Sequence, residues 1–256
     1  MSPNRTVGVE TVPRAARLGP EWPRERSEQE RAAERSEQER GLEQPRPVTE
    51  SQHDALEAVW EPARAAGSLG SVSIEELRGH AEGYISPSTR LERGARCVDL
   101  GTGVGVPGVL LAIEHSETTW RLLDSSSRRC EIALDAVRAA GLDSRVEVVH
   151  GRADDYGHDP HWRSTNDLVV ARLFGPPSEV AECGLPLLAE GGSLVVSVSD
   201  STATTWLAAD LAPLAASVVE RWETSSGAYL RVQRTGSAVA DRFPRREAAR
   251  RRAPLF

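Results

Sequence analysis

Residues 97–108 read CVDLGTGVGVPG, and the apolar run VLLAI follows over residues 109–113. The first apolar stretch ends in Asp99, three glycines then stand at alternate positions, and Pro107 and a fourth glycine precede the second run. This pattern predicts a strand, a tight turn and a helix start, because glycine allows close backbone approach and proline suits a first helical turn. Free N–H groups at that helix start would form a polar cradle. The stretch therefore predicts either a site for a nucleotide-like cofactor or simply a tight turn.

The composition indicates one α/β domain with appendages. The chain has 256 residues and a net charge of −7. Its three cysteines, Cys97, Cys130 and Cys183, are far apart and lie in apolar patterns, which predicts core thiols in a reducing compartment. No apolar run is long enough for a membrane span, and the N-terminus lacks a secretory signal. We therefore expect a cytoplasmic protein with no membrane partner.

Changes of composition divide the chain into four segments. Residues 1–48 are predicted to be a disordered charged segment, because Glu and Arg dominate it and little apolar surface is available to bury. Residues 49–92 are predicted to form a helical cap, with a capping box at Ser73 and Glu76. Residues 93–241 are expected to form the main domain. Residues 242–256 are expected to be a basic C-terminal tail.

Strand-like apolar runs alternate with helical patterns along the main domain. The predicted strands are residues 97–100, 120–123, 146–149, 168–171, 194–198, 218–222 and 228–232. Helices are predicted after the second strand, ending at Gly141, and over residues 180–188. The alternation predicts a doubly wound, mainly parallel seven-stranded sheet, with the last two strands in an antiparallel hairpin. Ligands of such sheets bind at the carboxyl ends of the strands.

Two cofactors compete for the glycine turn. Gly103, Gly105 and Gly108 match the dinucleotide fingerprint, and Asp124 follows about twenty residues later at a strand end. In a dehydrogenase, the pyrophosphate of NAD would lie on the helix N-terminus. S-adenosylmethionine (SAM) carries no phosphate and would rely on backbone contacts and carboxylates in the same crevice. Asp99 can orient the turn or meet the ammonium group of the cofactor, which favours SAM.

Two further acids are candidates for the same site. Asp124 would accept hydrogen bonds from the ribose hydroxyls of either cofactor, or it would cap the following helix. Asp154 follows the third strand and could accept the adenine amino group while Ala153 supplies an N–H group; the alternative is a surface loop acid. We expect no metal site, because no third ligand lies near His158 and His161.

In combination these motifs resemble the RsmG (GidB) family of small-subunit rRNA guanine-N7 methyltransferases. The Val-Pro-Gly ending of the glycine motif is the most specific feature, and residues 122–129, 170–172 and 242–255 resemble further family motifs. The resemblance covers residues 75–256. It implies a Rossmann-like class I methyltransferase fold, SAM as cofactor and methyl transfer to a guanine of 16S rRNA. It carries SAM contacts over to Gly101, Val106, Ala153, Asp154 and Arg172, which join Asp99, Gly103, Gly105 and Asp124 as the predicted cofactor site.

The acceptor chemistry fits the absence of an obvious catalytic base. Guanine N7 has a lone pair and no proton, so methylation needs only alignment and exclusion of water. The Gly175–Ser178 turn has the prolines but neither the polar anchor nor the aromatic residue of amino-group methyltransferases. Arg172 is predicted to contact guanine or phosphate, or else to pair with Asp154. The tail arginines are predicted to bind RNA phosphates, or else to be solvated: Arg242, Arg245, Arg246, Arg250, Arg251 and Arg252.

Other functions remain open from the sequence. They are a SAM methyltransferase with another RNA or a small-molecule substrate, a non-catalytic RNA-binding protein with the SAM fold, and an NAD-linked oxidoreductase. The oxidoreductase is disfavoured because no second catalytic domain follows the fingerprint. We expect rRNA or a small ribosomal subunit particle as the partner, and a monomeric protein.

Overall fold

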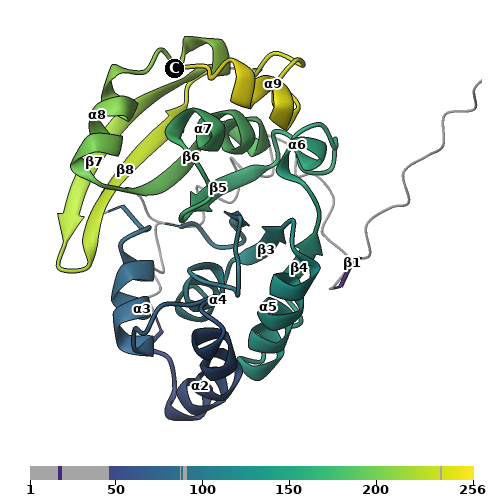
Figure 1. Cartoon of the computed structure of the whole chain (residues 1–256), viewed down its shortest axis with the longest axis vertical. Helices are drawn as coiled ribbons and strands as arrows, with labels where there is room; N and C mark the ends of the chain where they lie inside the picture. The colour runs from purple at the N-terminus through teal and green to yellow at the C-terminus, as the bar shows by residue number, and fades with distance from the viewer. Residues whose placement is uncertain (1–16, 19–45, 87, 89–90, 237) are drawn as a thin grey trace, which may run out of the picture.

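The computed structural model describes residues 17–18, 46–86, 88, 91–236 and 238–256 (Figure 1). Most of the segment predicted to be disordered, residues 1–48, lies outside these residues. Within it, Arg17–Leu18 forms the short strand β1 at the edge of the sheet.

One eight-stranded sheet of order β1-β4-β3-β2-β5-β6-β8-β7 runs through the described part of the chain. Its remaining strands are β2 (Arg96–Leu100), β3 (Thr119–Asp124), β4 (Val146–His150), β5 (Asn166–Ala171), β6 (Leu188–Val198), β7 (Ala216–Thr224) and β8 (Gly227–Arg234). Strands β2 to β6 pair in parallel, whereas β8 is antiparallel to both β6 and β7. The predicted seven strands and antiparallel hairpin are confirmed, and β1 adds an antiparallel edge beside β4.

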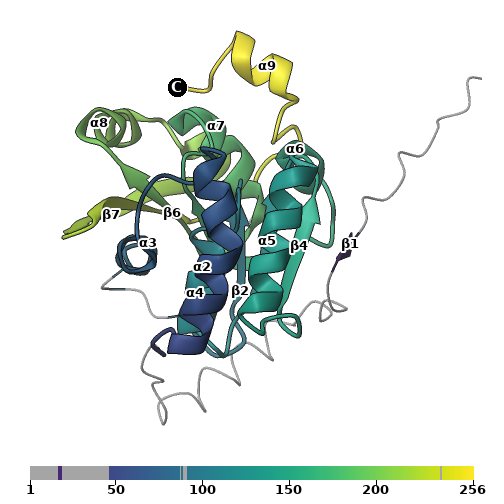
Figure 2. The ribbon, with the colours of Figure 1, turned by 60° about the horizontal axis from the view of Figure 1, so that its bottom comes forward.

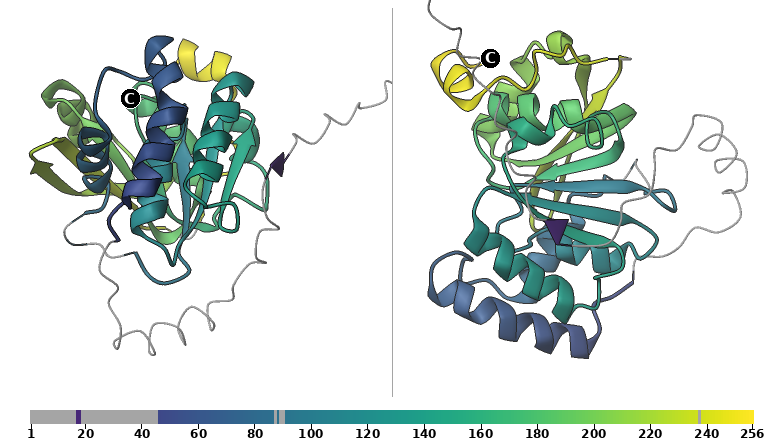
Figure 3. Two further views of the ribbon diagram at one scale, coloured as in Figure 1. Left: turned by 90° about the horizontal axis from the view of Figure 1, so that it is seen from below. Right: turned by 90° about the vertical axis from the view of Figure 1, so that its right-hand side faces the viewer.

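Helices cover both faces of the sheet (Figure 3). On one face lie α2 (Glu50–Ala65), α3 (Ile74–Glu82), α4 (Gly108–Glu114) and α5 (Ser127–Ala139). On the other side lie α6 (Ala153–Tyr156), α7 (Pro177–Gly184), α8 (Asp200–Ala208) and α9 (Glu247–Arg252). Within the described ranges, no helix is both long and apolar enough to cross a lipid bilayer.

The core lies in two apolar layers on either side of the sheet. Cys97 and Leu122 belong to the layer under α4 and α5, whereas their chain neighbours Val98 and Leu123 belong to the layer under α7. This alternation follows from the two-residue period of a strand. Because both faces are covered, ligands can reach the parallel strands only at their ends.

The N-terminal helices support the glycine turn. α2 and α3 begin at capping boxes on Thr49 and Ser73, so the helix predicted from Ser73 is confirmed. α2 lies beside α5 (Figure 2), and its Trp60 is fully buried in the same core as α4. The indole Nε1 of Trp60 donates to the carbonyl oxygen of Val104 at 3.0 Å. α2 therefore supports the glycine turn through the Trp60 side chain.

The helix predicted over residues 180–188 is wrong in its bounds. α7 ends at Gly184 and a 3-10 turn, η2 (Leu185–Leu187), follows it. Pro186 lacks the N–H group that would continue the α-helix. β6 then begins at Leu188 rather than at the predicted residue 194, because Leu188 already pairs with Asn166. The pairing with β5 is irregular between Leu188 and Ser193, where Gly191 has a φ of +76°.

Candidate active site

The glycine turn connects β2 to α4 and is tied at both ends by Asp99. One carboxylate oxygen, Oδ2, accepts from the Thr102 hydroxyl at 2.7 Å and from the Gly108 N–H at 2.8 Å. A Cβ at Gly108 would lie 2.8 Å from that oxygen and 2.4 Å from Leu122, so only glycine fits. The role predicted for Asp99 as the residue that orients the turn is thus seen in its hydrogen bonds.

The second oxygen of Asp99 has no protein partner. Asp99 is fully buried, and its Oδ1 makes no hydrogen bond to any described residue. Burial raises the pKa of Asp99 to about 6, although the bonds from Thr102 and Gly108 and the nearby Arg172 charge oppose this rise. A buried acceptor without a donor is costly. Oδ1 therefore suits a cationic N–H donor supplied by a ligand.

The N–H groups of the turn are not a free cradle, which corrects the sequence expectation. Gly101 and Thr102 donate to the carbonyl of Leu123 at 2.8 and 3.0 Å. Further along the turn, Gly103 donates to Asp124 Oδ2 at 2.9 Å. The N–H groups of Gly105 and Val106 donate to the carbonyl of Thr102, and that of Gly108 donates to Asp99. The turn is therefore held by carboxylates and carbonyls instead of presenting N–H donors to an anion.

Asp124 connects the turn with the start of α5. Besides the bond from Gly103, its Oδ1 accepts from the Ser126 N–H at 2.8 Å and from the Arg129 guanidinium at 2.7 Å. The helix-capping role that the sequence left open belongs to Ser126, whose hydroxyl accepts from the Arg129 N–H, while Asp124 holds the N–H of Ser126. Asp124 also lines the pocket described below, so ribose binding stays a prediction.

Asp154 lies in the first turn of α6 with its side chain almost wholly buried. It accepts from Arg152 Nε at 3.1 Å, and its other oxygen lies 3.9 Å from guanidinium nitrogens of Arg246 and Arg250. The alternative reading of Asp154 as a surface loop acid is wrong, because the strand end and α9 enclose it.

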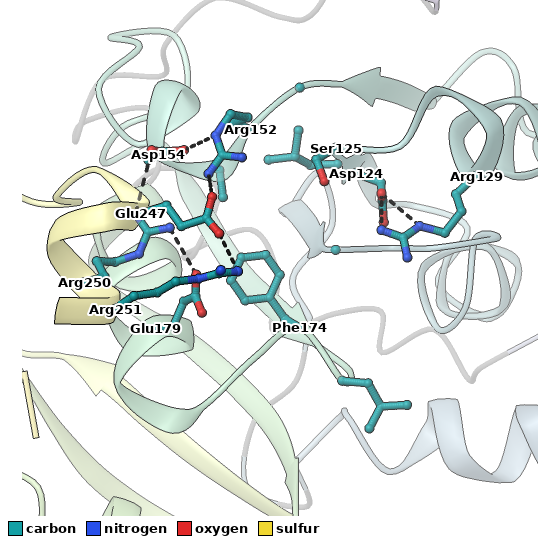
Figure 4. A pocket seen from close by; sticks show the side chains of 15 residues that line it. Asp124, Ser125, Arg129, Arg152, Asp154, Phe174, Glu179, Glu247, Arg250 and Arg251 are labelled. Atoms are coloured by element: carbon teal, nitrogen blue, oxygen red, sulfur yellow. Dashed lines mark hydrogen bonds and ion pairs between the residues drawn. The ribbon is translucent and has the colours of Figure 1, made fainter. Parts of the chain in front are cut away.

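A cavity of about 270 Å³ opens between these groups at the carboxyl ends of the strands (Figure 4). Of the predicted cofactor residues, Gly101, Asp124, Ala153 and Asp154 line it. Asp99, Gly103, Gly105, Val106 and Arg172 do not line it. Gly105, at φ +101°, and the buried Val106 pack inside the turn, where a Cβ at Gly105 would meet Val109 at 2.9 Å. Direct cofactor contacts of these five residues stay predictions.

The sequence reasoning missed several residues of the cavity. They are Ser125, Arg129, Arg152, Phe174, Glu179 and Glu247, some of which Figure 4 shows pointing across it. Arg250 and Arg251, which were predicted to bind RNA, also line the cavity. The Phe174 ring packs against the turn, since a Cβ at Gly101 would come within 2.6 Å of it. The position of Phe174, two residues after Arg172 and directly before the Gly175–Ser178 turn, was the available signal.

Arg172 follows β5 and is half-buried, with no ion pair or hydrogen bond to any residue that the structure describes. The alternative in which Arg172 pairs with Asp154 is therefore wrong, because Arg152, Arg246 and Arg250 surround that carboxylate instead. The neighbouring Leu173 is 91% exposed and has φ +53°, a left-handed conformation that is uncommon for leucine. The strand end thus presents a cation and an aliphatic side chain together.

The predicted RNA-binding arginines of the tail are mostly engaged within the protein. Arg245 makes a two-pronged pair with Glu182 at 2.8 and 2.7 Å, which raises the pKa of Arg245. Arg246 pairs with Asp155, Arg250 with Glu179 and Arg251 with Glu247. Arg242 lies over the Phe243 ring at 4.8 Å, and Arg252 has no ion pair among the described residues. The reading of the tail as solvated is wrong for Arg245 and Arg250; RNA binding stays a prediction.

Comparison with solved structures supports the fold. The structure of the mitomycin 7-O-methyltransferase MmcR superposes with a TM-score of 0.53 at 17% identity, covering 68% of this chain and 58% of that one. At this identity the likeness concerns the fold alone. It agrees with the class I methyltransferase fold expected from the sequence.

Comparison with characterised sequences identifies the family. A ribosomal RNA small subunit methyltransferase G of Desulfitobacterium hafniense is 37% identical over 102 residues, or 40% of this chain and 42% of that protein. The protein of the same description from Dictyoglomus thermophilum is 27% identical over 173 residues, or 65% of this chain and 71% of that protein. The chain thus matches less than half the length of the first relative. The family profile described as "GidB: rRNA small subunit methyltransferase G" matches residues 74–226, more than half of the chain. The chain therefore belongs to the GidB family.

Proposed function

We propose that this protein is a SAM-dependent methyltransferase that transfers a methyl group to N7 of a guanine in 16S rRNA. The proposal draws on the family match and on the cavity at the ends of β2 to β5. It names rRNA or a small ribosomal subunit particle as the substrate. It also takes the protein to act as a monomer in the cytoplasm.

The choice of SAM over NAD rests on one observation: the N–H groups of the glycine turn already donate to protein carboxylates and carbonyls. A pyrophosphate on a helix N-terminus needs free backbone N–H donors. Here the Gly103 and Gly108 donors face the carboxylates of Asp124 and Asp99, and those negative charges would repel a diphosphate. A sulfonium cofactor without phosphate does not meet this repulsion.

The residues at the site fit SAM in other respects. The unpartnered Oδ1 of Asp99 suits the ammonium group of the methionine moiety. We assign Asp124, at the end of β3, to the ribose hydroxyls and Asp154 with the Ala153 N–H to the adenine, because all three residues line the cavity. Gly101 and Phe174 line the same cavity as Asp124 and Asp154.

The acceptor chemistry fits the side chains around the cavity. Bound SAM supplies an electrophilic methyl group; the S–CH3 bond breaks as the N7–CH3 bond forms, and no proton is removed. The acids that line the cavity, Asp124, Asp154, Glu179 and Glu247, are each paired with an arginine. None is therefore placed as a free general base. The protein contributes alignment and exclusion of water, which supply about 7–11 kcal/mol in favourable cases.

The acceptor is proposed to approach past Arg172 and Leu173. Arg172 is an available cation for the guanine edge or an RNA phosphate, and Leu173 is an exposed apolar surface for the base. Next to Arg172, the buried Tyr84 hydroxyl lies 3.5 Å from the carbonyl oxygen of Ala171 and donates to Ser197 Oγ at 2.9 Å, which links the end of β5 to β6. Arg172 is thus the positioning candidate, in agreement with the sequence prediction.

Titration calorimetry and label transfer together test the proposal. The folded wild type is titrated with SAM and, separately, with NAD, and is then incubated with methyl-labelled SAM and 16S rRNA or small subunits. Saturable SAM binding and labelled 7-methylguanosine are expected. NAD binding without SAM binding would favour the oxidoreductase. SAM binding with label only in another nucleotide or a small molecule would point to a different substrate, and SAM binding with no transfer to a non-catalytic protein.

A further inference from the structure

The C-terminal helix α9 forms one side of the cofactor cavity. Glu247, Arg250 and Arg251 line the same cavity as Gly101 and Asp154 (Figure 4). α9 lies beyond the part of the chain that the family profile matches, residues 74–226. This wall of the site is therefore supplied from outside the matched region.

The segment that carries α9 is anchored at both of its ends. Phe243 is 2% exposed and packs in the core layer under α7. Arg245 holds the buried Glu182 with its guanidinium and also through its backbone N–H at 2.6 Å. At the other end, the ring of the terminal Phe256 lies 5.9 Å from that of Trp206 in α8. Residues 243–256 thus form a strap across the end of the sheet.

Between the anchors, the strap is attached by ion pairs around the cavity. Arg250 is 5% exposed and pairs with Glu179 at 3.2 Å, while Glu247 pairs with Arg152 at 2.7 Å. Arg246 pairs with Asp155 just outside the cavity. Arg152 and Arg250 both lie beside Asp154, at 3.1 and 3.9 Å. The strap and the residue assigned to the adenine therefore belong to one network of charged side chains.

We propose that the strap, residues 243–256, retains the cofactor and that its arginines act on cofactor residence rather than on RNA phosphates. The inference rests on the proposed function, since it takes the ligand to be SAM. The half-exposed pairs are individually weak because water screens them. The pair of the buried Arg250 with Glu179 is screened less, so the middle of the strap releases during cofactor exchange only when this pair opens too, while Phe243 and Arg245 keep it attached. Each pair that is broken shortens the residence of SAM.

A charge swap at Arg246 and Asp155 tests the strap without altering a residue of the cavity. The full-length variants Arg246→Asp, Asp155→Arg and the double variant are compared with the wild type. Dissociation of labelled SAM is followed after a chase with excess unlabelled SAM. Each single reversal is expected to raise the dissociation rate about two- to fivefold, as loss of an exposed pair implies. The double variant is expected to lower it again toward the wild-type rate, short of full restoration because the 3.9 Å contact of Arg246 with Asp154 is not rebuilt. Circular dichroism checks that each variant is folded.

A remote ion pair of similar exposure serves as the control. Arg93 and Glu117 pair at 2.6 Å, with side chains 78% and 36% exposed, against 73% and 52% for Arg246 and Asp155. Arg93→Glu is expected to leave SAM dissociation unchanged.

Hydrogen exchange of the α9 amides is expected to slow when SAM binds to the wild type.

The outcomes separate the strap from the proposed function. If the wild type fails to bind SAM, the proposed function falls and the strap falls with it. If the wild type binds SAM but both single reversals dissociate at the wild-type rate, the strap alone is overturned. If Arg246→Asp leaves SAM dissociation unchanged but weakens binding of 16S rRNA, the tail arginines bind RNA, as the sequence predicted, and do not retain the cofactor.

Discussion

The two walls of the proposed cofactor cavity are built in different ways. On the glycine-turn side, Asp99 bonds residues only three and nine positions further along the chain, and every partner is buried. On the strap side, Arg245 reaches Glu182 over 63 positions and Glu247 reaches Arg152 over 95. The position of one wall is therefore determined by a local motif, and that of the other by ion pairs between residues distant in the chain. The two should therefore respond differently to substitution, pH and salt.

The largest effect is expected where the strap meets the core. Arg245→Ala leaves the 1% exposed Glu182 side chain as an unpaired buried charge. We expect a loss of about 3 kcal/mol in the free energy of unfolding, the low end for breaking a buried pair because Arg245 is partly exposed. Urea denaturation measures it. The matched variant Arg252→Ala, which breaks no ion pair, should lie within about 0.5 kcal/mol of the wild type; equal losses would show that the Glu182 pair carries no special weight.

The turn side is tested by a single added methyl group. Gly108→Ala places a Cβ within 2.4 Å of Leu122 and 2.8 Å of Asp99 Oδ2. Overpacking of this kind should cost about 2 kcal/mol in the free energy of unfolding and weaken SAM binding. Gly70→Ala is the control, since its Cβ meets nothing within 4 Å. A wild-type stability for Gly108→Ala would mean that α4 can shift and that the turn is less rigid than its hydrogen bonds indicate.

The affinity for SAM should depend on pH through Asp99. The pKa of Asp99 is raised to about 6 by burial, and only the ionised carboxylate attracts an ammonium group. Between pH 7 and pH 5 the ionised fraction falls about tenfold, so the SAM dissociation constant should rise by about the same factor. Calorimetry at several pH values measures it. A flat profile would remove Asp99 from the ammonium site.

Stability responds to pH in the opposite sense, and two variants separate the effects. The folded-state pKa of Asp99 lies above its ordinary value, so its contribution to stability is present below about pH 4 and is lost as pH rises through 6. Burial raises the pKa of Glu114, at the far end of α4, to about 8, which extends the same loss to higher pH. Glu114→Gln should flatten the stability profile without changing the SAM profile. Asp99→Asn should flatten the SAM profile and weaken binding throughout.

The smallest effect expected is that of salt. Raising NaCl from about 0.1 to about 0.5 M should increase SAM dissociation roughly twofold, because it screens the half-exposed pairs of the strap. Amide exchange at Gly103 and Gly108 should not change, since their acceptors are buried. Faster exchange in the turn at high salt would contradict the proposed difference between the walls.

The turn side was predictable because its residues are neighbours in the chain. Asp99, the glycines and Pro107 all lie within one short stretch, and the strands that bring Asp124 and Asp154 beside them alternate with helices in the usual way. The carboxyl ends of parallel strands meet at one edge, so these acids could be placed together without a structure.

The strap was not predictable, because its contacts join residues that are distant in the chain. Its arginines are indistinguishable in sequence from a solvated or RNA-binding tail, because their partners Glu182, Glu179 and Asp155 lie far back in the chain. α9 itself has only six residues, and its apolar residues are two alanines. Nothing local marks such a helix. For the same reason the sequence could not decide between the two roles of Arg172, since Arg152 and the tail arginines lie at the Asp154 carboxylate.

Methylation of guanine N7 in 16S rRNA is the activity that we propose for this protein. The most direct measurement is to map 7-methylguanosine in 16S rRNA from cells that lack the gene, with restoration by the wild-type gene as the positive control. We predict that one 7-methylguanosine disappears from the RNA of the deletion strain and returns on complementation. An unchanged methylation pattern would show that this protein does not methylate guanine N7 in 16S rRNA.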